Sequence, residues 1–480
     1  MSEQATGFKP SLKLIDATMI VAGSMIGSGI FIVSTDILRH VGSAGWLTMV
    51  WVITGFMTVI AAVSYGEMSG MFPRAGGQYV FLREAYNPLA GFLYGWSSFT
   101  VIQTATIAAV GVAFARFTAY LVPQLGEDRI LMNLLGLKIS AAQLFAIAMI
   151  LFLTYTNTRG IKGGKIVQTT FTTVKLFSLF GLIVAGFLFA QHSFWDENWS
   201  TGMQAMQLEK DASGAFVIDG SWGAISGAAL IGAIAASMVG SLFSSDAWNN
   251  VTFIAGEIKN PKRNIGLSLF LGTLTVCTIY VLTNLMYLYV LPLSGIANPA
   301  GERVGVAASY NIFGDAGAYV IAVMIMISTF GCNNGLILAG ARVYYTMAND
   351  GLFFKSAGKL NKKAVPGWAL WAQGIVASVL CLSGGYNDLL DMIAFVVVIF
   401  YVATIIGIFI LRKTRPDAER PYRAFGYPVI PAIYILMGTV FCVFLITFKP
   451  AYTVWGLGIV LAGIPVYYLT IAGKHRKKLK

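Results

Sequence analysis

The sequence predicts an all-α polytopic membrane protein with about 12 transmembrane helices. Three observations support this fold class. Hydrophobic residues make up 57% of the 480 positions and charged residues only 11%, whereas a soluble domain carries roughly 25% charge. Apolar stretches long enough to cross a bilayer recur along the chain, and the basic residues fall between them. This composition excludes a soluble enzyme or a nucleic-acid binder, despite a net charge of +12.

The expected spans are bounded by charges or by Gly, Pro, Asn and Asp clusters. The first six are 14–38, 45–71, 89–121, 139–157, 166–190 and 223–258. The second six are 264–291, 314–348, 367–383, 389–412, 425–447 and 451–472. Together they are expected to form a single transmembrane domain over residues 1–480.

The basic residues predict the orientation of the spans. With the N-terminus inside, 25 of the 33 Lys and Arg residues fall on the inner side, seven on the outer side and Lys175 within a span. Lys and Arg accumulate in cytoplasmic loops. We therefore expect both termini in the cytoplasm and the protein in the inner (plasma) membrane. The basic charge reflects topology rather than a nucleic-acid partner.

The first span carries three glycines, Gly23, Gly27 and Gly29, where a helix would reach mid-membrane depth. Each glycine costs about 1 kcal/mol relative to alanine in a helix, so the cluster favours an interruption there. The spacing of Gly23 and Gly27 is also that of a helix-contact motif. On this segment alone, both interpretations remain open.

The sixth span places Ser244, Ser245 and Asp246 inside an apolar stretch that is too long for one straight helix. A charged group in lipid costs at least about 2.5–3.5 kcal/mol, so it is expected to face a protein cavity. Interrupted helices in the first and sixth spans, five apart, are typical of an inverted-repeat transporter. The repeats are expected at 14–190 and 223–412, with helices 11 and 12 at 425–472.

Interrupted helices expose backbone dipoles of both signs in one cavity. The amides of Ser28, Gly29 and Ile30 are expected to hold a carboxylate, and carbonyls near Met25, Phe243 and Ser244 an ammonium. Gly27 and Gly29 let the backbone approach the ligand without a Cβ. A zwitterionic α-amino acid fits this arrangement.

Lys175 lies about nine residues into the fifth span, or about 14 Å along a helix. A flexible lysine near a span end often snorkels to the headgroups. The alternative is a buried ammonium next to the first span, able to lose its proton.

The three histidines lie outside the spans, so no histidine relay is expected. The sequence predicts no cofactor and no metal site.

Six segments carry recognisable motifs, at residues 23–31, 72–79, 257–264, 328–331, 341–342 and 349–351. Together these motifs resemble the amino acid-polyamine-organocation permeases, and most of all the L-type amino acid transporter branch with its bacterial exchangers. The similarity extends over about residues 10–470.

This resemblance implies a LeuT-type fold with a 5+5 inverted repeat, discontinuous helices 1 and 6, and two further C-terminal helices. It implies sodium-independent amino acid transport by alternating access. The family's binding positions correspond to Met25, Gly27, Ser28 and Gly29 in the first span, and to Phe243, Ser244 and Asp246 in the sixth. Phe243 then acts as a gate over the substrate, and Lys175 matches the family's fifth-span lysine.

The loop at 123–138 has no cysteine, so the disulfide-linked heavy chain of animal members is not expected and a stand-alone carrier is favoured.

The expected function is transport of neutral L-amino acids by exchange or proton coupling. A carrier of cationic amino acids or polyamines, with Asp246 as counter-charge, is the first alternative. An intramembrane hydrolase using Lys175 with a serine, or a channel, belongs to a different functional class.

Overall fold

The helices of the first half follow the predicted spans closely. The structure is a computed structural model that describes residues 10–134, 137–160, 164–212, 214–382 and 386–469. The first-half elements are α1 (Leu14–Met25), η1 (Gly29–Phe31), α2 (Val33–Val41), α3 (Ala44–Met71), α4 (Gln78–Ala85), α5 (Pro88–Ser97), the π-helical η2 (Ser98–Ile102), α6 (Gln103–Leu121), η3 (Pro123–Leu125), α7 (Ala141–Thr158), α8 (Gly164–Phe189) and α9 (Trp195–Trp199).

The second half is also helical. Its elements are α10 (Gly227–Ser244), α11 (Asn250–Phe253), η4 (Ala255–Glu257), α12 (Pro261–Val290), α13 (Leu293–Ala297), η5 (Ala300–Glu302), α14 (Val304–Asn349), η6 (Lys355–Gly358), α15 (Gly367–Leu380), α16 (Tyr386–Thr414), α17 (Val429–Phe448) and α18 (Pro450–Tyr467). Within the described residues, nine helices are long and apolar enough to cross a membrane, and three shorter apolar helices accompany them. The protein is a polytopic membrane protein.

Both predicted interruptions are present. The first span is divided into α1, the 3-10 turn η1 and α2. The sixth is divided into α10 and α11 by residues 245–249. The span predicted to begin at 314 begins earlier, because α14 starts at Val304 and continues through a kink at Gly314 (φ 70°, ψ −162°). Polar residues before Gly314 had hidden this first segment from the apolar pattern.

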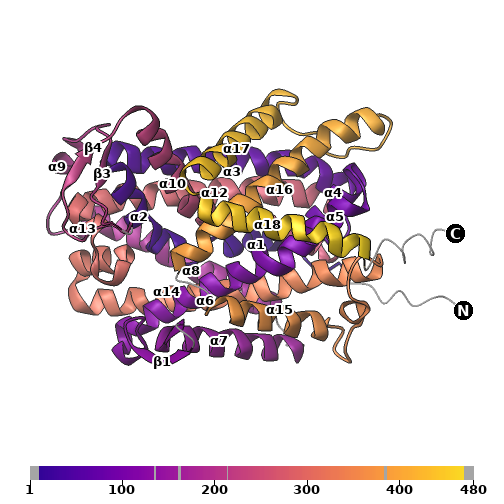
Figure 1. The fold of residues 1–480 in the computed structure, drawn as a ribbon, viewed down its shortest axis with the longest axis horizontal. Helices are drawn as coiled ribbons and strands as arrows, with labels where there is room; N and C mark the ends of the chain where they lie inside the picture. The colour runs from indigo at the N-terminus through magenta and orange to yellow at the C-terminus, as the bar shows by residue number, and fades with distance from the viewer. Residues whose placement is uncertain (1–9, 135–136, 161–163, 213, 383–385, 470–480) are drawn as a thin grey trace, which may run out of the picture.

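Two small antiparallel β-hairpins lie in the loops between the helices. Strands β1 (Ile130–Leu134) and β2 (Leu137–Ser140) pair in one, and β3 (Met206–Leu208) and β4 (Trp222–Ala224) in the other. Figure 1 shows both hairpins, α9 and α13 at one end of the bundle and α4 at the other. The loops predicted to share the outer side therefore gather at one end.

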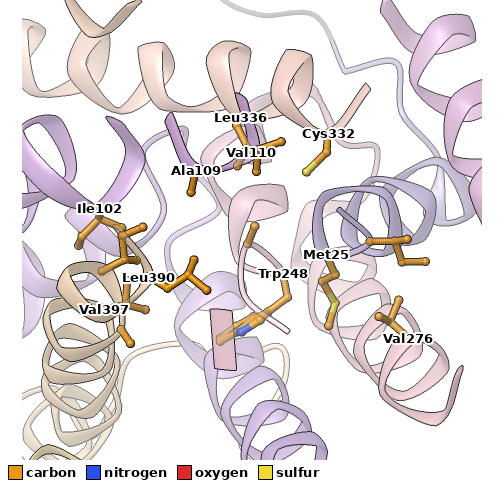
Figure 2. Packing of buried hydrophobic residues seen from close by; sticks show 14 of the residues in the cluster. Met25, Ile102, Ala109, Val110, Trp248, Val276, Cys332, Leu336, Leu390 and Val397 are labelled. Atoms are coloured by element: carbon orange, nitrogen blue, oxygen red, sulfur yellow. The ribbon is translucent and has the colours of Figure 1, made fainter. Parts of the chain in front are cut away.

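The interrupted helices lie inside the bundle. Helix α1 contacts α8, α12 and α14, and α10 contacts α2, α3 and α16. Figure 2 shows the apolar packing around them, with Met25, Trp248, Cys332 and Leu390 contributed by segments far apart in the sequence. Irregular backbone at membrane depth is tolerated where protein covers it, and this packing provides the cover.

Candidate functional site

The two breaks touch each other through glycines. A Cβ added at Gly29 would lie 2.0 Å from Ser244 Oγ, and one added at Gly240 would lie 2.5 Å from Val33 Cγ1. Gly29 is therefore required for close packing of η1 against α10. This contact gives Gly29 a packing role beside its expected role in admitting a ligand, and it leaves the helix-contact interpretation of Gly23 and Gly27 untested.

The carbonyl end of α1 is occupied by a lysine ammonium. Lys175 of α8 is 4% exposed, and its Nζ donates to the carbonyl oxygens of Gly23 and Ile26, at 3.0 Å each. Ser328 of α14 also donates to Ile26, at 3.4 Å. Because the last carbonyls of a helix carry partial negative charge, a cation here is stabilising. Lys175 does not snorkel to the membrane surface.

A tyrosine joins the carbonyls of the two breaks. The hydroxyl of Tyr280 on α12 lies 2.9 Å from the carbonyl oxygen of Met25 and 3.0 Å from that of Ser244. It therefore shares its proton between the two breaks. The carbonyl of Phe243 accepts from the amide of Asp246 at 3.1 Å. These carbonyls, expected to receive an ammonium, already have partners within the chain.

The amide side of the first break is different. Within the described part of the chain, the backbone amides of Ser28, Gly29 and Ile30 donate no hydrogen bond. All three residues are buried, and the Ser28 hydroxyl lies 3.2 Å from that of Tyr386 on α16. Successive amides without acceptors are suited to an anion. This is the position where the sequence predicts a substrate carboxylate.

The second break contains a carboxylate. Asp246 accepts a hydrogen bond from the hydroxyl of Tyr401 on α16. Trp248 packs against Tyr401 and Tyr65, with ring centroids 5.1 and 4.8 Å apart. Ala247 has a left-handed backbone (φ 63°), which costs a residue with a Cβ roughly 1–2 kcal/mol. Such strain persists where surrounding packing enforces it, and it gathers at functional sites.

Two small cavities adjoin Asp246. One lies toward Phe243 and Met57, the other toward Gln78 and Asn249, and each measures about 20 Å³. A cavity of that size holds one water. An amino acid does not fit without movement of the surrounding helices.

Aromatic rings and ion pairs close the site toward the end that carries the hairpins. Phe243 meets Tyr386 edge to face, with centroids 6.1 Å apart, and the guanidinium of Arg116 lies 5.6 Å from the Tyr386 ring centroid. Glu302 then bridges Arg116 and Arg39, at 2.9 and 3.0 Å. Phe243 therefore belongs to a series of contacts that continues through Tyr386 and Arg116 to Glu302.

The opposite end is closed by the segment before α1. The backbone of Leu12 pairs with that of Ile258, directly after η4. Glu257 is held in turn by Arg342 of α14 at 2.8 Å. These contacts link the start of the first span, the end of the sixth and α14. Contacts between distant segments therefore lie on both sides of the two breaks.

Sequence analysis missed the partners of the breaks. Tyr280, Tyr386 and Tyr401 were not singled out, because a tyrosine in an apolar span is an ordinary core residue. Cys332 also contacts the first break, since its Sγ lies 3.5 Å from the carbonyl oxygen of Ser24. Among the residues that the structure describes, no cluster of three His, Cys, Asp or Glu side chains is arranged to hold a metal.

Comparison with known proteins identifies the family. The model of the family described as "Amino acid permease" matches residues 12–472. The chain belongs to the amino acid permease family. This match confirms the resemblance inferred from the motifs, and it covers both interrupted spans and the helices that surround them.

Two relatives extend the comparison. The b(0,+)-type amino acid transporter 1 of Mus musculus is 27% identical, and the alignment covers 98% of this chain and 89% of the relative. The large neutral amino acids transporter small subunit 2 of Homo sapiens is also 27% identical, covering 98% of this chain and 82% of the relative. Both relatives are named as amino acid transporters.

One expectation about partners is wrong. The missing cysteine in the loop at 123–138 had favoured a carrier without an ancillary heavy chain. The human relative is named a small subunit, which places it in an assembly with another subunit. The absence of a cysteine excludes only a disulfide bond to a second subunit at this loop. It does not exclude noncovalent contacts with such a subunit.

Proposed function

We propose that this amino acid permease is a sodium-independent secondary transporter of neutral L-amino acids, working by exchange or proton coupling through alternating access. The observation that carries the proposal is the pair of adjoining breaks, with the amides of Ser28, Gly29 and Ile30 lacking acceptors at one side. These amides suit the α-carboxylate common to all amino acids. The relative named for large neutral amino acids supports the substrate class.

Lys175 supports independence from sodium. Its ammonium already lies on the carbonyls of Gly23 and Ile26, the place where an ion-coupled relative would bind a cation. Met25, Gly27, Ser28, Gly29 and Ile30 would form one side of the substrate site. Phe243, Ser244 and Asp246 would form the other, with Phe243 as gate.

The proposed architecture is a LeuT-type 5+5 inverted repeat at 14–190 and 223–412, followed by two helices within 425–472. The distribution of 25 inner and seven outer basic residues supports cytoplasmic termini and insertion in the plasma membrane. Contacts on both sides of the two breaks, through Glu302 and through Glu257, support alternating access. Transport would then require these contacts to open in turn.

A carrier of cationic amino acids or polyamines remains the second candidate, and Asp246 is the observation that favours it. Its carboxylate is partly buried and lines two small cavities. A hydrolase is less well supported, because the ammonium of Lys175 is directed at backbone carbonyls and is not paired with a serine among the described residues. A channel is less well supported, because the two cavities beside Asp246 have room for about one water each.

Counterflow in proteoliposomes tests the proposal. Vesicles of purified protein are loaded with unlabelled leucine, and external labelled leucine is followed with and without sodium and a pH gradient. Saturable uptake that is accelerated by internal leucine and unchanged by sodium supports the proposed exchange. Uptake driven only by a pH gradient selects proton coupling. Non-saturable flux, or stronger competition by arginine or a polyamine than by neutral amino acids, would overturn the neutral-carrier proposal.

A further inference from the structure

A groove outside the substrate path lies between α3, α12 and the loop that precedes α17. Its volume is about 460 Å³. Gly266, Leu267 and Phe270 of α12 form one wall, and Tyr422 and Phe425 of the loop form another. Phe270 is 37% exposed and Phe425 70% exposed. The groove therefore presents apolar surface toward the surroundings of the bundle.

The loop that forms one wall of the groove is held in place by residues of α3. A Cβ added at Gly66 of α3 would lie 2.7 Å from the ring of Tyr422, so the glycine makes room for the tyrosine. The loop is anchored by Glu67, which is 1% exposed. Glu67 accepts from the backbone amide of Ala424 at 2.7 Å and lies 3.3 Å from Arg420.

The rim of the groove is basic. Lys262 and Arg263 lie in the first turn of α12 and line it. Lys262 pairs with Glu419 at 2.8 Å, but both side chains are largely exposed, and such pairs contribute little. Over the described part of the chain, the guanidinium of Arg263 forms no hydrogen bond or ion pair. An anion at this rim would compete with Glu419 for Lys262, and at Arg263 it would meet a guanidinium that has no acidic partner among the described residues.

The spacing along α12 suits an amphipathic ligand. Eight residues separate Lys262 from Phe270, or about 12 Å along a helix. In the proposed orientation, Lys262 lies at the cytoplasmic headgroup level and Phe270 lies in the hydrocarbon. A ligand filling the groove then has an anionic end at the basic rim and an apolar chain against Leu267 and Phe270.

We propose that this groove binds one anionic phospholipid of the cytoplasmic leaflet, with its phosphate on Lys262 and Arg263 and an acyl chain along α12. Basic pockets between helices on the cytoplasmic side recognise anionic headgroups. The proposal rests on the orientation given under Proposed function. Lipid binding is measured without transport, so its failure and the failure of the transport proposal are distinguishable.

Native mass spectrometry of the full chain in detergent tests the site. The protein is titrated with phosphatidylglycerol and with phosphatidylcholine carrying the same acyl chains. We expect one phosphatidylglycerol to bind preferentially. The double variant K262Q/R263Q should lose affinity for it by about fivefold per charge removed, from the attraction of one basic residue to an anionic surface. Equal binding of the two lipids by the native protein would overturn the proposal.

The matched control is K359Q/K362Q, which removes two exposed lysines from the loop between α14 and α15. It should leave phosphatidylglycerol binding within about twofold, because neither lysine lines the groove and exposed charges are screened by salt. A loss equal to that of K262Q/R263Q would show a general charge effect and contradict a site.

Two further measurements separate lipid from free phosphate. The exposed Phe425 can be removed without opening the core, and F425A should weaken both lipids about equally by shortening the apolar wall. Glycerol 3-phosphate should not displace phosphatidylglycerol, since it lacks acyl chains. Full displacement by glycerol 3-phosphate, or binding unaffected by F425A, would overturn the assignment to a lipid.

Discussion

Each of the two helix breaks leaves polar groups without helical partners inside the bundle, and the two breaks pair these groups in different ways. At the first break, the α1 carbonyls are satisfied by side chains from other helices, chiefly Lys175 and Tyr280. At the second, the chain supplies its own carboxylate, Asp246, held by Tyr401 beside a strained Ala247. The first break presents backbone dipoles to a ligand, and the second break presents a carboxylate side chain.

This difference suggests a division of labour. Backbone amides recognise the carboxylate that every amino acid carries, so substitutions around the first break should affect all substrates alike. A carboxylate side chain discriminates by charge, so a change at the second break should affect substrates selectively. Four variants test this difference between the two breaks.

Lys175→Ala should have the largest effect. It removes the charged donor from the Gly23 and Ile26 carbonyls, and hydrogen bonds to charged groups contribute about 1.5–3 kcal/mol each. We expect proteoliposome uptake of leucine and arginine to fall alike, on the order of 100-fold. Lys210→Ala, in the loop before α10, is the control and should transport normally. Near-normal uptake by Lys175→Ala would remove the lysine from the proposed mechanism.

Gly29→Ala tests the contact between the breaks. The added Cβ would lie 2.0 Å from Ser244 Oγ, and overpacking costs about 1–3 kcal/mol. We expect a loss of about tenfold or more in uptake for every substrate. Adding Ser244→Gly should restore uptake to near that of Ser244→Gly alone, because it vacates the space. A double variant as impaired as Gly29→Ala would mean that Gly29 acts on the substrate rather than on α10.

Asp246→Asn should separate substrates. If the carboxylate selects by charge, competition by arginine should weaken about tenfold, the factor for losing a charge-assisted contact, while leucine uptake stays within about threefold. Tyr401→Phe is the matched variant, since it keeps the carboxylate and removes its donor, and it should retain arginine competition. An equal collapse of leucine and arginine transport in Asp246→Asn would contradict the division of labour.

Tyr280→Phe should have the smallest effect on transport. It leaves the carbonyls of Met25 and Ser244 without their shared donor, and an unsatisfied buried acceptor costs about 1–3 kcal/mol. Thermal unfolding in detergent should show a lower melting temperature, with uptake reduced by about threefold. Tyr287→Phe removes a single longer contact, 3.3 Å to Ile30, and should shift melting less. A larger shift for Tyr287→Phe would refute the bridging role of Tyr280.

The amino-acid sequence alone predicts the membrane class, the approximate spans and both interruptions, and it singles out Lys175 as a candidate for burial next to the first span. These features are local: the length of an apolar stretch, a cluster of glycines, and the cost of a charge at membrane depth can each be evaluated without knowing neighbours. The segment before Gly314 and the two hairpins were missed, because their short, mixed sequences carry no comparable signal.

The groups that satisfy the two breaks can be identified only in the folded chain. Nothing in the sequence distinguishes Tyr280, Tyr386 and Tyr401 among 21 tyrosines, since their roles depend on α12 and α16 lying against α1 and α10. The same packing showed that Gly29 faces Ser244. The energetic cost of an interrupted helix is set by its own residues, whereas the groups that offset it come from distant parts of the chain, so only the assembled fold reveals them.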